Sequence, residues 1–188
     1  VGEMHAKKIS ALSDLAMKTG APVIGLVDCA GMRLQEATDA LEAFGGIYLK
    51  QTMASGMIPQ ITAVFGTCGG GMAVVPALTD FTFIESKKGK MFVNSPNALD
   101  GNYTEKCDTA SAEFQSKETG LIDAVESEEE ILAEIRQLIG LLPSNFEDND
   151  SFEECTDDLN RACEDIAACA GDTSLALSRI ADNGIFFE

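Results

Sequence analysis

Apolar residues recur at two periods along the chain, and the change of period marks alternating helices and strands. In residues 3–19 they stand three or four positions apart and stop at Gly20, which is typical of an amphipathic helix closed by a glycine cap. Short unbroken apolar runs, such as residues 58–65, predict buried strands. The pattern predicts strands at residues 22–27, 58–65, 81–84, 91–93 and 121–125, and helices at residues 3–19, 36–55, 72–79, 109–118 and 127–141.

Strands that alternate with helices and lack a polar face are typical of a parallel sheet covered by helices, so the predicted fold class is α/β. Two details stay open at this level. Gly45 and Gly46 weaken their helix by about 1 kcal/mol each relative to alanine, so it could break there. The basic turn at residues 87–90 is interpreted as the solvated tip of a hairpin, with attraction of ligand phosphates as the alternative.

The last quarter of the chain has a different character. Residues 144–153 are polar and acidic, which indicates a solvated linker, and spaced apolar residues then predict a helix over 159–169. Asp172 or Thr173 is expected to cap a final helix that runs to Gly184. We therefore expect a core at residues 1–143 and a linker with a helical arm at residues 144–188. Because the chain starts at Val1 and its last residues are largely apolar, we also expect it to be part of a longer polypeptide.

Charge and composition exclude several classes of function. Of the net charge of −18, residues 126–188 carry −14, with 17 acidic and 3 basic residues. This excess argues against nucleic-acid binding, which needs a basic surface. No apolar run is long enough for a membrane span, and no signal peptide is visible. Six cysteines without a CxxC pair, and a single histidine, argue against a metal site and favour free thiols in a reducing cytoplasm.

A glycine-rich stretch at residues 66–72 (Gly-Thr-Cys-Gly-Gly-Gly-Met) joins a predicted strand to a predicted helix. Three consecutive glycines remove every Cβ where the free N–H groups of the helix point outward, so these donors could approach a ligand oxygen closely. A tight turn packed against a neighbouring strand explains the same residues. The residues alone leave both interpretations open.

The usual catalytic and nucleotide-binding motifs are missing from this stretch. A dinucleotide fingerprint that starts at Gly69 would need glycine where Val74 stands, and there is no P-loop. The only histidine, His5, has no serine partner near the glycines, so we interpret it as a surface or packing residue. Cys29 and Cys68 have no evident activating base and are interpreted as packing residues.

A second loop, residues 28–33, follows the strand before the glycine-rich one. Ligands of parallel sheets bind beyond the carboxyl ends of the strands, so the two loops could converge on one ligand oxygen. Backbone N–H groups without a side-chain nucleophile suit an oxyanion hole that stabilises the enolate of a thioester.

Several blocks of the sequence, in order and without gaps, resemble one known family. They are residues 3–9 (Glu-Met-His-Ala-Lys-Lys-Ile), 16–26 (Ala-Met-Lys-Thr-Gly-Ala-Pro-Val-Ile-Gly-Leu), 54–61 (Ala-Ser-Gly-Met-Ile-Pro-Gln-Ile) and 76–81 (Pro-Ala-Leu-Thr-Asp-Phe). The chain resembles the carboxyltransferase component of biotin-dependent acyl-CoA carboxylases of the propionyl-CoA, methylmalonyl-CoA and acetyl-CoA types. The resemblance extends to residues 180–188, where the first domain of that family leads into its second, which is absent from this chain.

This resemblance implies a crotonase-like fold, a superhelix of ββα units, that holds an acyl-CoA. It implies that carboxybiotin on a carrier protein exchanges a carboxyl group with the α-carbon of the acyl-CoA. The expected partners are a biotin carboxyl carrier protein, a biotin carboxylase subunit and further copies or subunits in an oligomer. Carried over to this sequence, Gly70 and Gly71 donate to the thioester oxygen, and the pocket is lined by Ala30, Gly31, Arg33 and Gly69.

The sequence departs from the family pattern at Cys29, Ala30 and Met72, which bears on the width of the acyl pocket. Two alternative functions remain. A crotonase-like hydratase or isomerase would need a carboxylate acid–base, for which Glu36 and Glu42 are the nearby glutamates. A non-catalytic domain that docks a partner through its apolar C-terminal arm is the other.

Overall fold

The computed structural model describes residues 1–98, 108–148, 155–158 and 160–186. These residues cluster into two compact units, 1–149 and 150–188. The strands are β1 (Val23–Cys29), β2 (Gln60–Gly69), β3 (Phe81–Glu85), β4 (Lys90–Phe92) and β5 (Ala124–Glu126). The α-helices are α1 (Glu3–Thr19), α2 (Ala37–Ala54), α3 (Val74–Ala77), α5 (Ala112–Phe114), α6 (Glu128–Leu141) and α7 (Thr173–Ile180), and short helical turns lie at Leu34–Glu36, Gly70–Ala73, Pro96–Ala98, Gln115–Thr119, Ile166–Cys169 and Asp182–Gly184.

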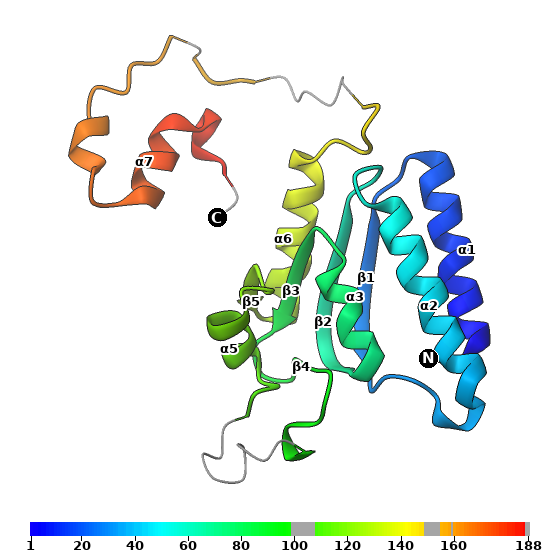
Figure 1. The fold of residues 1–188 in the computed structure, drawn as a ribbon. Helices are drawn as coiled ribbons and strands as arrows, with labels where there is room; N and C mark the ends of the chain where they lie inside the picture. The colour runs from blue at the N-terminus through cyan, green and yellow to red at the C-terminus, as the bar shows by residue number, and fades with distance from the viewer. Residues whose placement is uncertain (99–107, 149–154, 159, 187–188) are drawn as a thin grey trace. The chain divides into compact units, whose positions relative to one another are not determined.

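The first unit is built on a parallel sheet in the order β1-β2-β3-β5 (Figure 1). Helices α1 and α2 run side by side near β1, and α6 packs near β3 and β5 (Figure 1). The expected parallel α/β arrangement is therefore confirmed. The strand β2 lies in the middle and its residues 60–64 are buried, because it has a neighbouring strand on each side.

The strand β1, at the edge of the described sheet, is buried on one face only and not on both faces as expected. Its side chains alternate: Val27 is buried in the core, whereas Ile24 is 45% exposed and Leu26 is 59% exposed. Successive side chains of a strand point to opposite faces, so Ile24 and Leu26 share the face away from Val27. An apolar run in the sequence does not show whether both faces are covered.

The predicted hairpin between residues 81–84 and 91–93 is wrong. Both β3 and β4 pair in parallel with β2, with β3 opposite residues 61–64 and β4 opposite residues 67–69. The basic turn at residues 87–90 connects two strands that pair with successive parts of β2. It is held by the Glu85 carboxylate, which accepts the amide protons of Lys87, at 3.0 Å, and of Lys88.

Several predicted helix ends are confirmed. Gly20 closes α1 in the left-handed conformation, and Ser127 with Glu130 forms the capping box that begins α6. Helix α2 continues through Gly45 and Gly46 without a break, so its packing outweighs the low helix propensity of the glycines. None of the helices in the described ranges is long and apolar enough to cross a membrane.

The second unit is less helical than expected. The helix predicted over residues 159–169 is wrong for the described residues 160–165, and only the turn Ile166–Cys169 forms. The Asp158 carboxylate accepts the amide proton of Asn160 at 2.9 Å, a local hydrogen bond that competes with helix formation. Asp172 does cap the last helix, because its carboxylate accepts the amide proton of Leu175 at 2.9 Å.

Candidate functional site

Only part of the glycine-rich stretch at residues 66–72 forms a loop. Strand β2 continues through Gly69, because β4 pairs with residues 67–69 and prolongs the sheet. A 3-10 turn, Gly70–Ala73, then leads directly into the short helix α3. The expected loop at residues 66–72 therefore reduces to the turn that Gly70 and Gly71 begin.

An irregularity in the sheet brings the ends of β1 and β2 together. Val27 pairs with Val64 but Cys29 pairs with Cys68, so β2 has two extra residues between these pairs. The Asp28 carboxylate fills the irregularity and accepts the amide proton of Thr67 at 2.9 Å. A Cβ on Gly66 would overlap this carboxylate, so a larger residue there would have to displace the Asp28 side chain.

The two loops meet backbone to backbone. Gly31 has φ +114°, and a Cβ on it would lie 2.7 Å from the carbonyl oxygen of Gly69. A Cβ on Gly69 would lie 3.0 Å from the carbonyl oxygen of Ala30. The structure thus places Ala30, Gly31, Gly69 and Gly70 together, as the sequence predicted from convergence of the strand ends.

Gly70 and Gly71 present backbone donors at this junction. They are the first two residues of the 3-10 turn, so its internal hydrogen bonds do not use their N–H groups. The turns, loops and caps of the described ranges do not use either amide. Gly70 has φ +60°, and a Cβ built on it would have no heavy atom within 4 Å. The turn therefore begins with two glycine amides beside open space at Gly70, an arrangement suited to holding a developing negative charge on oxygen.

Arg33 lies at the edge of this arrangement. Its guanidinium pairs with the Glu36 carboxylate at 3.2 Å, and Glu36 also accepts the first amide proton of α1, from Glu3, at 2.6 Å. The hydrogen bond from the Glu3 amide, together with Arg33, holds the pKa of Glu36 below its usual value. The contacts of Arg33 thus direct it to the start of α1 rather than to the glycine turn.

The thiols beside the site are packing groups. Cys29 Sγ accepts the amide proton of Gly31 at 3.3 Å and so helps to shape the first loop. Cys68 is fully buried, and burial, with a smaller contribution from Cys29, raises its pKa to about 12. A thiol with this pKa stays protonated near neutral pH and is not a nucleophile. His5 is exposed on α1 and accepts the amide proton of Gly2 at 3.4 Å.

Met72 points into the interior rather than into the open space beside Gly70. It belongs to the buried core and lines a largely apolar, partly open cavity of about 250 Å³ with Ile9, Val27, Ile47 and Val75. Sequence reasoning missed two polar residues that hold the site: Asp28, described above, and Tyr48, whose hydroxyl donates to the carbonyl oxygen of Gly71 at 2.5 Å. Tyr48 is 23 residues away, and only the fold reveals this contact.

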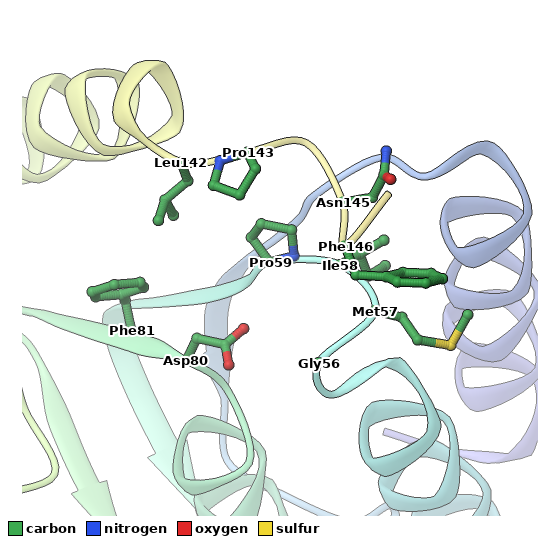
Figure 2. Close-up of a pocket in the computed structure, with 10 residues that line it drawn as sticks. All are labelled: Gly56, Met57, Ile58, Pro59, Asp80, Phe81, Leu142, Pro143, Asn145 and Phe146. Carbon is green, nitrogen blue, oxygen red and sulfur yellow. The ribbon is translucent and has the colours of Figure 1, made fainter. Parts of the chain in front are cut away.

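A further cavity, of about 320 Å³, lies at the opposite ends of the strands, where β2 and β3 begin (Figure 2). It is mostly apolar, and Asp80 alone carries a charge among the described residues that line it. The Asp80 carboxylate accepts the amide proton of Gln60 at 2.8 Å. Because parallel sheets bind ligands at the carboxyl ends of their strands, we place the candidate site at the glycine turn and not here.

Metal-ligating side chains do not gather among the described residues of this unit. Across the residues whose positions are described, no group of three or more histidine, cysteine, aspartate or glutamate residues could hold a metal ion.

Comparison with known proteins identifies the family. The carboxyl transferase domain family matches residues 1–188, the full length of the chain. This chain belongs to the carboxyl transferase domain family. The resemblance inferred from the sequence blocks is thereby confirmed.

Two relatives of this carboxyl transferase domain act on acyl-CoA, as their names state. The methylmalonyl-CoA decarboxylase subunit alpha of Veillonella parvula is 37% identical over 199 residues, which cover 100% of this chain and 39% of that protein. The propionyl-CoA carboxylase beta chain of Roseobacter denitrificans is 35% identical over 202 residues, which cover 100% of this chain and 39% of that protein. The chain therefore spans about two fifths of the length of these relatives.

Solved structures confirm the crotonase-like fold. The transcarboxylase 12S structure with hydrolyzed methylmalonyl-coenzyme A bound has a TM-score of 0.88 at 28% identity, covering 100% of this chain and 38% of its own. The beta subunit of Pseudomonas aeruginosa geranyl-CoA carboxylase has a TM-score of 0.66 at 27% identity, covering 76% and 28%.

Proposed function

We propose that this carboxyl transferase domain is the acyl-CoA-binding part of an enzyme that moves a carboxyl group between carboxybiotin and the α-carbon of a short acyl-CoA. The observation that carries the proposal is the 3-10 turn that begins with Gly70 and Gly71, whose internal hydrogen bonds leave both amides unused, beside open space at Gly70. The named relatives act on methylmalonyl-CoA or propionyl-CoA, and the 12S structure holds a methylmalonyl-CoA product, which supports this substrate class.

In this proposal the chain acts through its backbone. The Gly70 and Gly71 N–H groups hold the thioester oxygen and stabilise the negative charge that develops when the α-carbon becomes an enolate. Ala30, Gly31 and Gly69 fix the position of the turn through the contact between the two loops. Arg33, paired with Glu36 at the edge of the site, is assigned to the rim that the coenzyme A moiety crosses. Biotin, when present on its carrier, donates or accepts the carboxyl group.

The remaining organisation belongs to the same proposal. Residues 1–143 form the acyl-CoA-binding core, and residues 144–188 form an arm that leads to a second domain. The partners are a biotin carboxyl carrier protein, a biotin carboxylase subunit and other copies or subunits of an oligomer, and the 12S relative forms a hexamer. The five described cysteines carry free thiols, which supports a reducing compartment such as the cytoplasm.

The structure does not favour the alternative of a hydratase or isomerase. The Glu36 carboxylate is engaged by Arg33 and by the start of α1, and Glu42 is exposed and lines a groove between α1 and α2. An acid–base carboxylate would have to face the α- and β-carbons of the substrate beside the glycine turn. A purely structural role would leave the open space beside Gly70 without a use.

Titration calorimetry with propionyl-CoA and methylmalonyl-CoA tests the proposal. Gly70→Val places a side chain into the open space in front of the turn, so binding should fall by at least about tenfold. Gly56→Val is the matched control, because Gly56 also has a positive φ, +75°, and open space around its Cβ position. Equal binding by both variants, with circular dichroism showing intact folds, would refute the proposal.

A further inference from the structure

We infer that Tyr48 is the positioning residue of the oxyanion turn, and that its hydroxyl fixes the orientation in which Gly70 and Gly71 present their amides. This inference rests on the proposed function and deepens it. The observation is the hydrogen bond from Tyr48 Oη to the carbonyl oxygen of Gly71, at 2.5 Å.

The turn needs an external constraint because its own bonding is sparse. Three consecutive glycines leave the backbone with more accessible conformations than any other residues would. The 3-10 turn has only four residues, and the α-helix that follows it also has four. Donors of an oxyanion hole stabilise charge only when they are held in place before the reaction. Contacts from another element must therefore supply the rigidity.

Helix α2 supplies two such contacts, one to the turn and one to the helix α3 that follows it. Tyr48 holds the Gly71 carbonyl, and Gln51, three residues later, donates from Nε2 to the carbonyl oxygen of Val75 at 3.3 Å. Gln51 in turn is joined to the sheet, because Gln60 Nε2 donates to its carbonyl oxygen at 3.0 Å. Of these contacts, the one from Tyr48 is the one made to a residue of the candidate oxyanion hole.

Tyr48 is itself well positioned for this role. Its ring packs against Phe44, one helical turn earlier, with the ring centroids 5.9 Å apart, and Phe44 is buried in the core. Partial burial raises the pKa of the Tyr48 hydroxyl, so it remains protonated and able to donate at neutral pH. The hydroxyl also limits the space beside the turn, because a Cβ on Gly71 would lie 2.9 Å from Tyr48 Oη.

The role predicts a specific defect in Tyr48→Phe, which removes only the hydroxyl. Binding of propionyl-CoA should weaken about fivefold to tenfold, since the carbonyl oxygen meets misplaced donors. Binding of the corresponding thioether, in which a methylene group replaces the carbonyl, should be unchanged. Thr52→Val is the matched control: it removes a hydroxyl from the same helix, but one that donates within α2 to the Tyr48 carbonyl at 2.8 Å.

A second variant keeps the inference testable if Tyr48→Phe perturbs the fold. In Gly71→Ala the new Cβ should displace the Tyr48 hydroxyl, so its effect on thioester binding should match that of Tyr48→Phe. The double variant should be no weaker than either single one, because the hydroxyl that causes the overlap is gone.

Calorimetry with the two ligands separates the outcomes. Selective loss of thioester binding in Tyr48→Phe, with Thr52→Val like the wild type, supports the inference. Equal weakening of thioester and thioether, or no change in either, overturns the role of Tyr48 and leaves the proposed function in place. Failure of the wild-type chain to prefer the thioester overturns the proposed function itself.

Discussion

Gly31 and Gly70 share one backbone feature, a positive φ, but have opposite surroundings. Both have a positive φ, +114° and +60°, and they lie in the two loops that meet at the carboxyl ends of β1 and β2. A Cβ on Gly31 would lie 2.7 Å from the Gly69 carbonyl oxygen, whereas a Cβ on Gly70 would meet nothing within 4 Å. Gly31 is thus required by packing, and the free space at Gly70 is available to a ligand.

The comparison shows how a site can be built almost entirely from backbone. The contact at Gly31 brings one loop against the other, and the turn at Gly70 uses the resulting position to present two amides. The side chains that assist, Asp28 and Tyr48, bind backbone groups of β2 and of the turn. Among the residues that the structure describes, no contact places a charged side chain at the turn itself. Such an arrangement suits the proposed role, in which backbone amides stabilise negative charge on oxygen without a nucleophile.

The largest expected effect on stability comes from a substitution at Gly31. Gly31→Ala combines an unfavourable positive φ with overlap against the Gly69 carbonyl, and should lower the free energy of unfolding by about 3 kcal/mol. Urea denaturation followed by circular dichroism measures the change. Gly25→Ala in β1 is the control, because its Cβ would meet no atom nearer than 3.8 Å. A loss below about 1 kcal/mol in Gly31→Ala would show that the contact of the loops is loose.

The thiol beneath the two loops provides a second test through pH. The pKa of Cys68 in the folded chain is about 12, raised from 9.0 by burial. Above pH 9 the unfolded chain loses this proton while the folded chain keeps it, so this contribution to stability is complete below pH 9 and is lost as pH rises toward 12. Denaturation at pH 8 and pH 10 should differ by about 1.4 kcal/mol more in the wild type than in Cys68→Ala. An equal pH dependence in both would contradict the burial of Cys68.

The smallest expected effect concerns a position where a positive φ is adopted by alanine instead of glycine. Ala37, which begins α2, is a non-glycine residue with φ +45° and ψ −118°. Ala37→Gly should therefore stabilise the chain by about 1 kcal/mol, whereas Ala43→Gly, within α2, should destabilise it by a similar amount. Thermal unfolding of the two variants measures both signs. Destabilisation by Ala37→Gly would mean that this backbone carries no strain.

Local signals in the sequence were sufficient for many features of the fold. Gly20, the Ser127–Glu130 capping box and Asp172 end or begin helices through contacts within a few residues, and the structure confirms them. Convergence of the two loops was also predictable, because it follows from the parallel order of β1 and β2. The residues that determine these features are close together in the sequence, so a local pattern is enough to predict them.

The missed features depend on residues far apart in the chain. The length of β2 is set by its pairing with β4, and the predicted hairpin was wrong because β4 pairs with β2 instead of β3. The exposure of one face of β1 depends on which elements cover that face. The contact between Tyr48 and Gly71 joins a helix to a turn that lies beyond the next strand. A hydrophobic pattern has no information about such partners.

Infrared spectroscopy of bound propionyl-CoA, labelled with ¹³C at the thioester carbonyl, tests the central claim most directly. Two hydrogen bonds from Gly70 and Gly71 should polarise the carbonyl and lower its stretching frequency relative to free propionyl-CoA. The shift should be absent in Gly70→Val and retained in Gly56→Val. A bound thioester whose carbonyl frequency equals that of the free ligand would contradict the assignment of these two glycines as the oxyanion donors.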